Sequence, residues 1–235
     1  MGVKERIIGA AREDGRVVLT EVESKQIIRG EGIKVVDTRL AKTRDEAIAI
    51  AKEIGFPVAL KTASPKIIHK SDSGGVKLGI ISSAEVGRMY SEVANLGKRL
   101  GTSKRKSGVS VQKMVPDGVE VIMGISKDPQ FGQVLMFGLG GVFVETLGDV
   151  SFRIVPLDRR DAREMIREIK GYPVLQGHRR QDPVDILALE DMLLKLSELA
   201  RKTPEIKELD LNPVFAYTKG AIAVDARIIL ESTEN

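Results

Sequence analysis

The chain has 235 residues, of which 42% are hydrophobic and 30% charged, and it contains no cysteine. This length and composition are typical of a soluble globular protein with one large domain or two small lobes. The high share of charged residues suits a heat-adapted protein. The absence of cysteine excludes disulfides and thiol chemistry. The net charge of +4 comes from mixed acids and bases, and only 4% of the residues are aromatic, which argues against a nucleic-acid binder. Because the sequence has no long apolar run and no signal-peptide core, we expect a cytoplasmic protein.

Helices and strands alternate in the first half, which predicts an α/β or α+β fold. Capping-box spacing at Thr20, Thr43 and Ser82 predicts three helix starts, with ends near residues 30–32 and 54 for the first two. After Ser82, apolar residues recur at intervals of three and four, as on one buried helix face. Strands are predicted over three segments, 35–40, 58–63 and 76–81.

In the second half strands dominate. A composition shift near residues 101–116 indicates a boundary between two lobes, and residues 101–108 are predicted to form a basic exposed loop. Asp158 is predicted to begin one helix, and Asp182 with Pro183 another that runs to about residue 202 after a loop over 171–182. The strands predicted beyond the boundary are 109–115, 119–126, 133–137, 151–157, 208–216 and 221–230.

One loop combines a histidine with basic residues and glycines. Residues 69–75 read His-Lys-Ser-Asp-Ser-Gly-Gly and follow a predicted strand that carries Lys61. Glycines let backbone N–H groups approach an anion, and Lys61 and Lys70 add positive charge, so the loop is a candidate phosphate site. A neutral imidazole can attack phosphorus, which makes His69 a candidate phosphohistidine. On the residues alone, an ordinary strand lysine and a solvated loop histidine are the preferred interpretations, and there is no P-loop motif.

Polar side chains alternate with leucines over residues 208–213. If a turn centred at 218–219 joins the last two strands, Asn212 pairs with Asp225 and Asp210 with Arg227 on one face of the sheet. Amide and carboxylate oxygens, completed by phosphate and water, suit Mg²⁺. A polar sheet face with ion pairs between strands explains the same pattern equally well.

Taken in order, these segments resemble the ATP-grasp fold. More narrowly, the chain is similar over almost its whole length to the small β subunit of ADP-forming acetyl-CoA (acyl-CoA) synthetases, relatives of succinyl-CoA synthetase. The resemblance implies a two-lobed fold with ATP between the lobes, the small lobe being residues 21–115 and the large lobe residues 1–20 and 116–235. It rests on the segments 55–61, 69–76, 111–115 with Glu120, Gly140-Gly141 with Glu145, and 211–213 with Asp225.

The resemblance also implies site residues. Lys61 matches a lysine that contacts phosphate, residues 112–115 match a hinge that holds adenine, and Glu120 matches a ribose-binding acid. Asn212 and Asp225 match Mg²⁺ ligands, His69 matches a histidine that relays phosphate, and Asp210 matches an acid that supports a phosphohistidine. The full set expected to bind nucleotide is Lys61, Lys70, Ser71, Gln112, Lys113, Met114, Val115 and Glu120.

The implied reaction converts acyl-CoA, ADP and phosphate to carboxylate, CoA and ATP through an acyl phosphate and a phosphohistidine. The family carries its CoA-binding and ligase domains, with the primary active-site histidine, on an α subunit, so we expect an α2β2 partner assembly. The succinyl-type enzyme has glycine at the position of His69. Two alternatives stay open: another ATP-grasp carboxylate ligase, in which His69→Asn would be nearly silent, and a non-catalytic nucleotide-sensing module.

Overall fold

The computed structural model describes residues 2–63, 74–99, 108–141, 148–177 and 182–232, and its contacts divide the chain into two compact units. The first unit contains Met1–Leu19, Ser24–Val35 and Asp117–Asn235, and the second contains Thr20–Glu23 and Val36–Pro116. The basic loop expected over 101–108 lies, except for its last residue, outside the described residues. Within the described ranges, no helix combines the length and hydropathy needed to cross a bilayer.

The division differs from the expected lobe boundaries over residues 24–35. These residues were expected in the lobe that covers 21–115, but they belong to the first unit. Ile27, Ile28 and Ile33 are buried in the hydrophobic core of that unit, which explains the assignment. Only the first turn of helix α2 (Glu21–Gly30) is grouped with the second unit.

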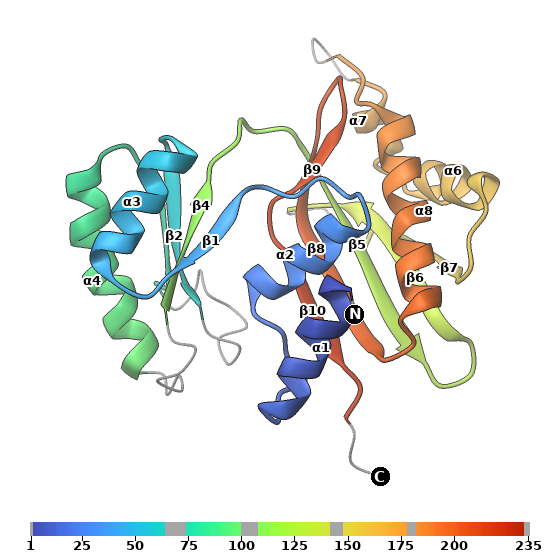
Figure 1. Ribbon diagram of the computed structural model, residues 1–235. Coiled ribbons are helices and arrows are strands. Elements are labelled where there is room, and N and C mark those ends of the chain that lie inside the picture. The colour runs from blue at the N-terminus through green and yellow to red at the C-terminus, as the bar shows by residue number, and fades with distance from the viewer. Residues whose placement is uncertain (1, 64–73, 100–107, 142–147, 178–181, 233–235) are drawn as a thin grey trace. The chain divides into compact units, whose positions relative to one another are not determined.

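The first unit is built on an antiparallel sheet of six strands, with the order β10-β8-β5-β6-β7 and with β9 paired to β8. Helix α8 packs on β5 and β6, and α6 packs on β6 and β7 (Figure 1). The strands are β5 (Val119–Asp128), β6 (Gly132–Leu139), β7 (Val150–Ile154), β8 (Ile206–Ala216), β9 (Ala221–Ala223) and β10 (Arg227–Leu230). Besides most of α2, the helices are α1 (Val3–Glu13), α6 (Arg159–Glu168), α7 (Tyr172–Leu175) and α8 (Ile186–Lys202).

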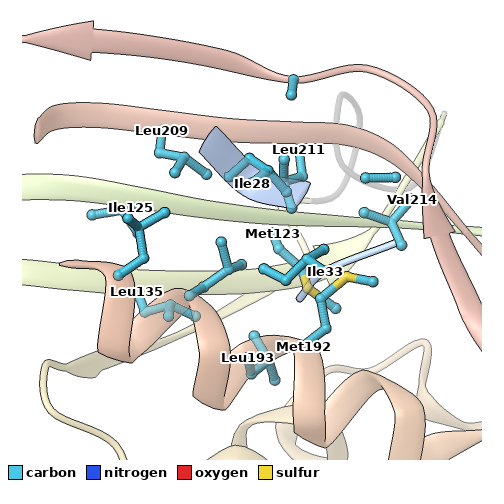
Figure 2. Packing of buried hydrophobic residues seen from close by; sticks show 14 of the residues in the cluster. Ile28, Ile33, Met123, Ile125, Leu135, Met192, Leu193, Leu209, Leu211 and Val214 are labelled. Carbon is cyan, nitrogen blue, oxygen red and sulfur yellow. The ribbon is translucent and has the colours of Figure 1, made fainter. Parts of the chain in front are cut away.

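One face of this sheet forms the core of the first unit. Leu209 and Leu211 of β8 and Met123 of β5 belong to the same buried cluster as Leu193 of α8 (Figure 2). Because side chains alternate between the two faces of a strand, the residues between the leucines point away from this core. Asp210 therefore lies on the face of the sheet opposite the core cluster.

The second unit has a four-stranded antiparallel sheet with the order β1-β4-β2-β3 and two helices. Helices α3 and α4 pack against this sheet, and their apolar residues share one buried cluster with Leu60, Val109 and Val111. All six residues of β2 are buried. The elements are β1 (Thr38–Ala41), α3 (Arg44–Ile54), β2 (Val58–Ala63), β3 (Val76–Ile80), α4 (Ser83–Arg99) and β4 (Gly108–Lys113).

The three expected capping residues are confirmed. Thr20 forms the reciprocal box: its amide donates to Glu23 Oε2 at 2.8 Å, and the Glu23 amide donates to Thr20 Oγ1 at 3.2 Å. Thr43 and Ser82 also accept the expected amide bonds, at 3.1 and 3.3 Å. In those two helices the glutamate reaches back to the amide one residue before the cap. Local sequence therefore determines where these helices begin.

Several expected element bounds required corrections, most of them in the C-terminal half. Helix α8 begins after Asp185 and not after Asp182, because the Asp185 carboxylate accepts the amide of Ala188 at 3.0 Å and the amide of Gly220 at 2.9 Å. The loop expected over 171–182 contains the short helix α7. The last expected strand is divided into β9 and β10, and the first expected strand is shortened to β1, with residue 35 forming only an isolated bridge.

Candidate functional site

The second unit buries four polar side chains on the sheet face that its core cluster does not use. Thr38, Lys61, Ser110 and Gln112 are all at least nine-tenths buried. Lys61 pairs with Ser110 across β2 and β4, and Gln112 of β4 pairs with Thr38 of β1. Directly paired residues point to the same face, so these side chains form one polar patch. Buried polar groups need partners, and here the Thr38 hydroxyl donates to the carbonyl of Val36 and the Ser110 hydroxyl donates to the carbonyl of Lys61.

Lys61 forms a buried ion pair. Its Nζ lies 3.0 Å from Oε1 of Glu21 in the first turn of α2, and the two side chains are only 7% and 3% exposed. A cavity of about 230 Å³ adjoins the pair and is lined by Glu21, Glu23, Lys42, Ala63 and Ser110 among others. The partner of Lys61 is therefore a carboxylate of its own unit, 40 residues away in sequence.

The two strands that flank the candidate phosphate loop in sequence lie side by side at this lysine, where Lys61 pairs with Val76. His69, Lys70 and Ser71 lie outside the described residues. Where the chain returns, the carbonyl of Gly75 accepts the amide of Thr62 at 2.8 Å. The segment that carries the histidine thus leaves and rejoins the sheet next to Lys61.

The expected adenine hinge is partly committed to internal contacts. The ammonium of Lys113 donates to the carbonyl of Gly55 at 2.8 Å and to the next carbonyl along the chain at 3.1 Å. The amides of Lys113 and Met114 donate to the carbonyls of Asp37 and Pro57. The Lys113 side chain therefore holds the C-terminal end of α3, a role that the sequence pattern did not indicate.

The first unit presents its acidic residues in the register expected from the sequence. Arg227 of β10 pairs with Asp210 of β8, and Ala223 of β9 pairs with Val214 of β8. The two pairs follow one continuous register along β8. This shared register sets Asn212 opposite Asp225, between the two paired stretches. The predicted pairing of Asp210 with Arg227 is confirmed, whereas Asp225 lies in the gap between β9 and β10.

A β-bulge in β8 was not expected. The pairing with β5 shifts between Val121, which lies opposite Val214, and Met123, which lies opposite Leu211. Two residues of β8, Asn212 and the cis-linked proline after it, therefore occupy the place of one. Bulges redirect side chains and interrupt a ladder, and Asn212 is exposed at this bulge.

The carboxylates on this face repel one another. Burial raises the pKa of Asp210, the negative charges of Asp225 and Glu208 raise it further, and the positive charge of Arg227 opposes them. The described residues contain no cluster of three or more His, Cys, Asp or Glu side chains able to hold a metal. Asn212 and Asp225 offer one amide and one carboxylate, which fits Mg²⁺ because this ion keeps waters and phosphate oxygens as ligands.

The first unit has a cavity of about 640 Å³. Among the residues that line it are Glu120, Gly140, Gly141 and Tyr217. A Cβ on Gly140 would lie 2.8 Å from the Glu120 Cβ, so a glycine is needed where the turn passes this side chain. Burial raises the pKa of Tyr217, and the charge of Asp117 adds to that effect. Glu145, which follows the glycine turn, lies outside the described residues.

An ATP-grasp domain family matches residues 10–230 of this chain. Over 229 residues the chain is 48% identical to the acetate–CoA ligase [ADP-forming] II subunit beta of Pyrococcus furiosus, covering 96% of this chain and 97% of that one. The chain belongs to the β subunits of ADP-forming acetate–CoA ligases. The family and the ATP-grasp fold predicted from the motifs are therefore confirmed.

Solved structures agree with this membership in the acetate–CoA ligase family. A dinucleotide-forming acetyl-coenzyme A synthetase 1 of Ca. Korarchaeum cryptofilum, in complex with coenzyme A, Ca-AMPCP and HgCl⁺, superimposes with a TM-score of 0.93 at 48% identity, covering 97% of this chain and 100% of that chain. A second structure of that enzyme, with coenzyme A and Mg-AMPPCP, has its phosphohistidine segment pointing towards the nucleotide binding site. It gives a TM-score of 0.86 at 46% identity, over the same shares of the two chains.

Proposed function

We propose that this chain is the nucleotide-binding subunit of an enzyme that converts acetyl-CoA or another acyl-CoA, ADP and phosphate to the carboxylate, CoA and ATP. The observation that carries the proposal is the 48% identity along nearly the full length of an ADP-forming acetate–CoA ligase β subunit. The buried polar patch around Lys61, beside which the His69 loop begins and ends, supports it.

Three groups of residues bind the phosphates, the adenine and the ribose of the nucleotide. Lys61, with Lys70 and Ser71 of the loop, binds phosphate oxygens, since ammonium and hydroxyl groups are suitable donors to phosphate. The segment from Gln112 to Val115 binds adenine, with the ammonium of Lys113 acting only as a support because it is already bound to carbonyls. Glu120 accepts hydrogen bonds from the ribose.

Magnesium belongs to this proposal as the metal cofactor. Asn212 and Asp225 would hold it, and the bound ion would neutralise charge on the phosphates. The Mg-AMPPCP bound to the related synthetase supports this assignment. The shared register of the strand pairs on either side, which sets Asn212 opposite Asp225, also supports this assignment.

His69 carries the phosphoryl group. Its neutral imidazole nitrogen attacks the phosphorus of the phosphoryl donor presented by the α subunit, forming an N–P bond as the bond to the donor breaks. An oxygen of the ADP β-phosphate then attacks this phosphorus, the N–P bond breaks, and ATP leaves. We assign to Asp210 the support of the phosphohistidine, because a carboxylate is a suitable acceptor for an imidazole N–H.

An α subunit that carries the CoA and acyl sites completes the enzyme, in an α2β2 assembly. The related Pyrococcus furiosus protein is itself called a β subunit, which supports a partner of this kind. The acyl group is then recognised on the partner and not by this chain.

Phosphoryl labelling tests the proposal. The purified chain, alone and with an α subunit, is incubated with Mg²⁺ and γ-labelled ATP, and the label is mapped by mass spectrometry. We expect an acid-labile, alkali-stable label on His69 that disappears in His69→Asn and after chelation of Mg²⁺.

His178 provides a matched control, because it is the only other histidine of the chain. His178→Asn is expected to keep the label. A label that persists in His69→Asn, or no label even with the α subunit present, would contradict the relay and favour another ATP-grasp ligase or a nucleotide sensor.

A further inference from the structure

Glu21 is a buried carboxylate with no part in the chemistry described so far. Its side chain is 3% exposed, and its Oε1 lies 3.0 Å from the ammonium of Lys61, whose side chain is 7% exposed. On the same face of β2, Lys61 is flanked by the small residues Ala59 and Ala63. The neighbours of the charged pair on this strand are therefore small apolar side chains.

Stability alone is a weak reason for such a pair. Removing each of the two charges from water is costly, and buried ion pairs are often no more stabilising than apolar residues of equal volume. A pair that contributes little to stability is instead suited to keeping one of its members charged and oriented. Here the member that needs its charge is Lys61, since a neutral amine would not attract phosphate.

The local structure fixes the Glu21 carboxylate. Glu21 follows Thr20, whose reciprocal capping box with Glu23 determines where α2 begins. The helix start is thus set by its own sequence, and the carboxylate is presented to the sheet from a fixed position. An ammonium has three donors, so Lys61 can bind Glu21 and a phosphate oxygen at the same time.

We propose that Glu21 is a positioning residue for nucleotide binding: it keeps Lys61 charged and directs its ammonium to the phosphate. This inference rests on the proposed role of Lys61 as a phosphate ligand. Glu23 and Lys42 are the two other charged residues that line the adjoining cavity.

Calorimetric binding of Mg-ATP, ADP and adenosine to the full chain tests the inference. Glu21→Gln keeps the length of the side chain but removes its charge, and we expect it to weaken ATP and ADP binding about tenfold or more. Adenosine has no phosphate, so its affinity should not change. Glu21→Asp keeps the charge and should restore most of the lost affinity.

Two further variants complete the design. Glu23→Gln alters the same helical turn and the same cavity but keeps an oxygen for the cap, so we expect wild-type binding of all three ligands. Lys61→Gln should lose affinity for ATP and ADP, and the double variant with Glu21→Gln should bind them no more weakly than Lys61→Gln alone.

The outcomes separate the two proposals. If Lys61→Gln binds ATP and adenosine like the wild type, Lys61 is not a phosphate ligand and its proposed role fails. If Lys61→Gln weakens ATP binding but Glu21→Gln does not, only the role of Glu21 fails. Equal losses of ATP and adenosine in Glu21→Gln, or a Glu21→Asp variant as weak as Glu21→Gln, would mean that Glu21 merely holds the fold together.

Discussion

Asp210 carries its carboxylate on the face of β8 that points away from the core cluster, in surroundings that disfavour its charge. Burial raises the pKa of Asp210, with smaller contributions in the same direction from Asp225 and Glu208, against the opposing charge of Arg227. A group whose pKa is raised by folding weakens the folded state once the pH exceeds that pKa. The native protein therefore carries an electrostatic cost at neutral pH that disappears when Asp210 is protonated.

Asp210→Asn is expected to stabilise the free protein while impairing phosphoryl transfer. The amide has no charge to desolvate, so the melting temperature should rise by a few degrees at pH 7, at about 2–4 °C for each kcal/mol in a chain of this size. The gain should shrink as the pH is lowered towards about 4, where the carboxyl group of the unfolded chain also binds protons. Thermal unfolding followed by circular dichroism, without Mg²⁺ or nucleotide, measures the rise in melting temperature and its dependence on pH. The phosphoryl-labelling experiment described above measures the loss of transfer.

Glu208→Gln serves as the control for this change, since it neutralises a carboxylate two residues earlier on the same face. We expect it to alter the melting temperature less than Asp210→Asn does. A lower melting temperature for Asp210→Asn at neutral pH would show that the pair with Arg227 outweighs the cost of burial.

At the scale of elements, the start of α8 depends on a contact between distant segments. Asp185→Ala removes both the cap of α8 and the bond to the Gly220 amide. Losing a cap costs about 1 kcal/mol and losing a further hydrogen bond about another 1 kcal/mol, so we expect a loss of roughly 2 kcal/mol. Asp182→Ala should change stability by less than about 0.5 kcal/mol. The midpoints of urea unfolding give the stability of both variants. If Asp182→Ala lost as much stability as Asp185→Ala, the assignment of Asp185 alone as the cap would be wrong.

The same residues show which parts of the fold can be predicted from the sequence. The caps at Thr20, Thr43 and Ser82 depend on partners three residues away, so the local pattern was sufficient. Asp182 with Pro183 gave an equally good local signal, but the choice of Asp185 is reinforced by Gly220, 35 residues later. Local rules cannot detect such a partner.

The candidate site divides in a similar way. The pairing of Asp210 with Arg227 followed from strand alternation and the position of one turn. The bulge at Asn212 was missed because it arises against β5, almost 90 residues earlier in the chain. Glu21 was missed as the partner of Lys61 because the pattern in α2 indicated only a helix start, and nothing in it pointed to strand β2.

On the scale of the whole molecule, each unit has a hydrophobic core of its own. Ile80 belongs to the buried cluster of the second unit, and Leu193 to that of the first. Ile80→Ala and Leu193→Ala should each cost about 2–5 kcal/mol, because a buried cavity is left behind. In native-state hydrogen exchange we expect Ile80→Ala to speed exchange in β2 and β4, and Leu193→Ala to speed it in β5 and β8. Uniform acceleration in both units would show that the two cores unfold together.

The first unit is assembled from both ends of the chain. Lys4 donates to the Thr203 hydroxyl across 199 residues, and the Leu19 amide donates to the carbonyl of Ile228 in β10. The second unit, apart from residues 20–23, is one continuous stretch. During synthesis on the ribosome, that stretch can complete its core as soon as it has emerged, since domains generally fold as units. Helix α1 precedes this stretch in the chain, whereas β8 and β10 of its own unit follow it. The apolar face of α1 is therefore available to chaperones until those strands have been made.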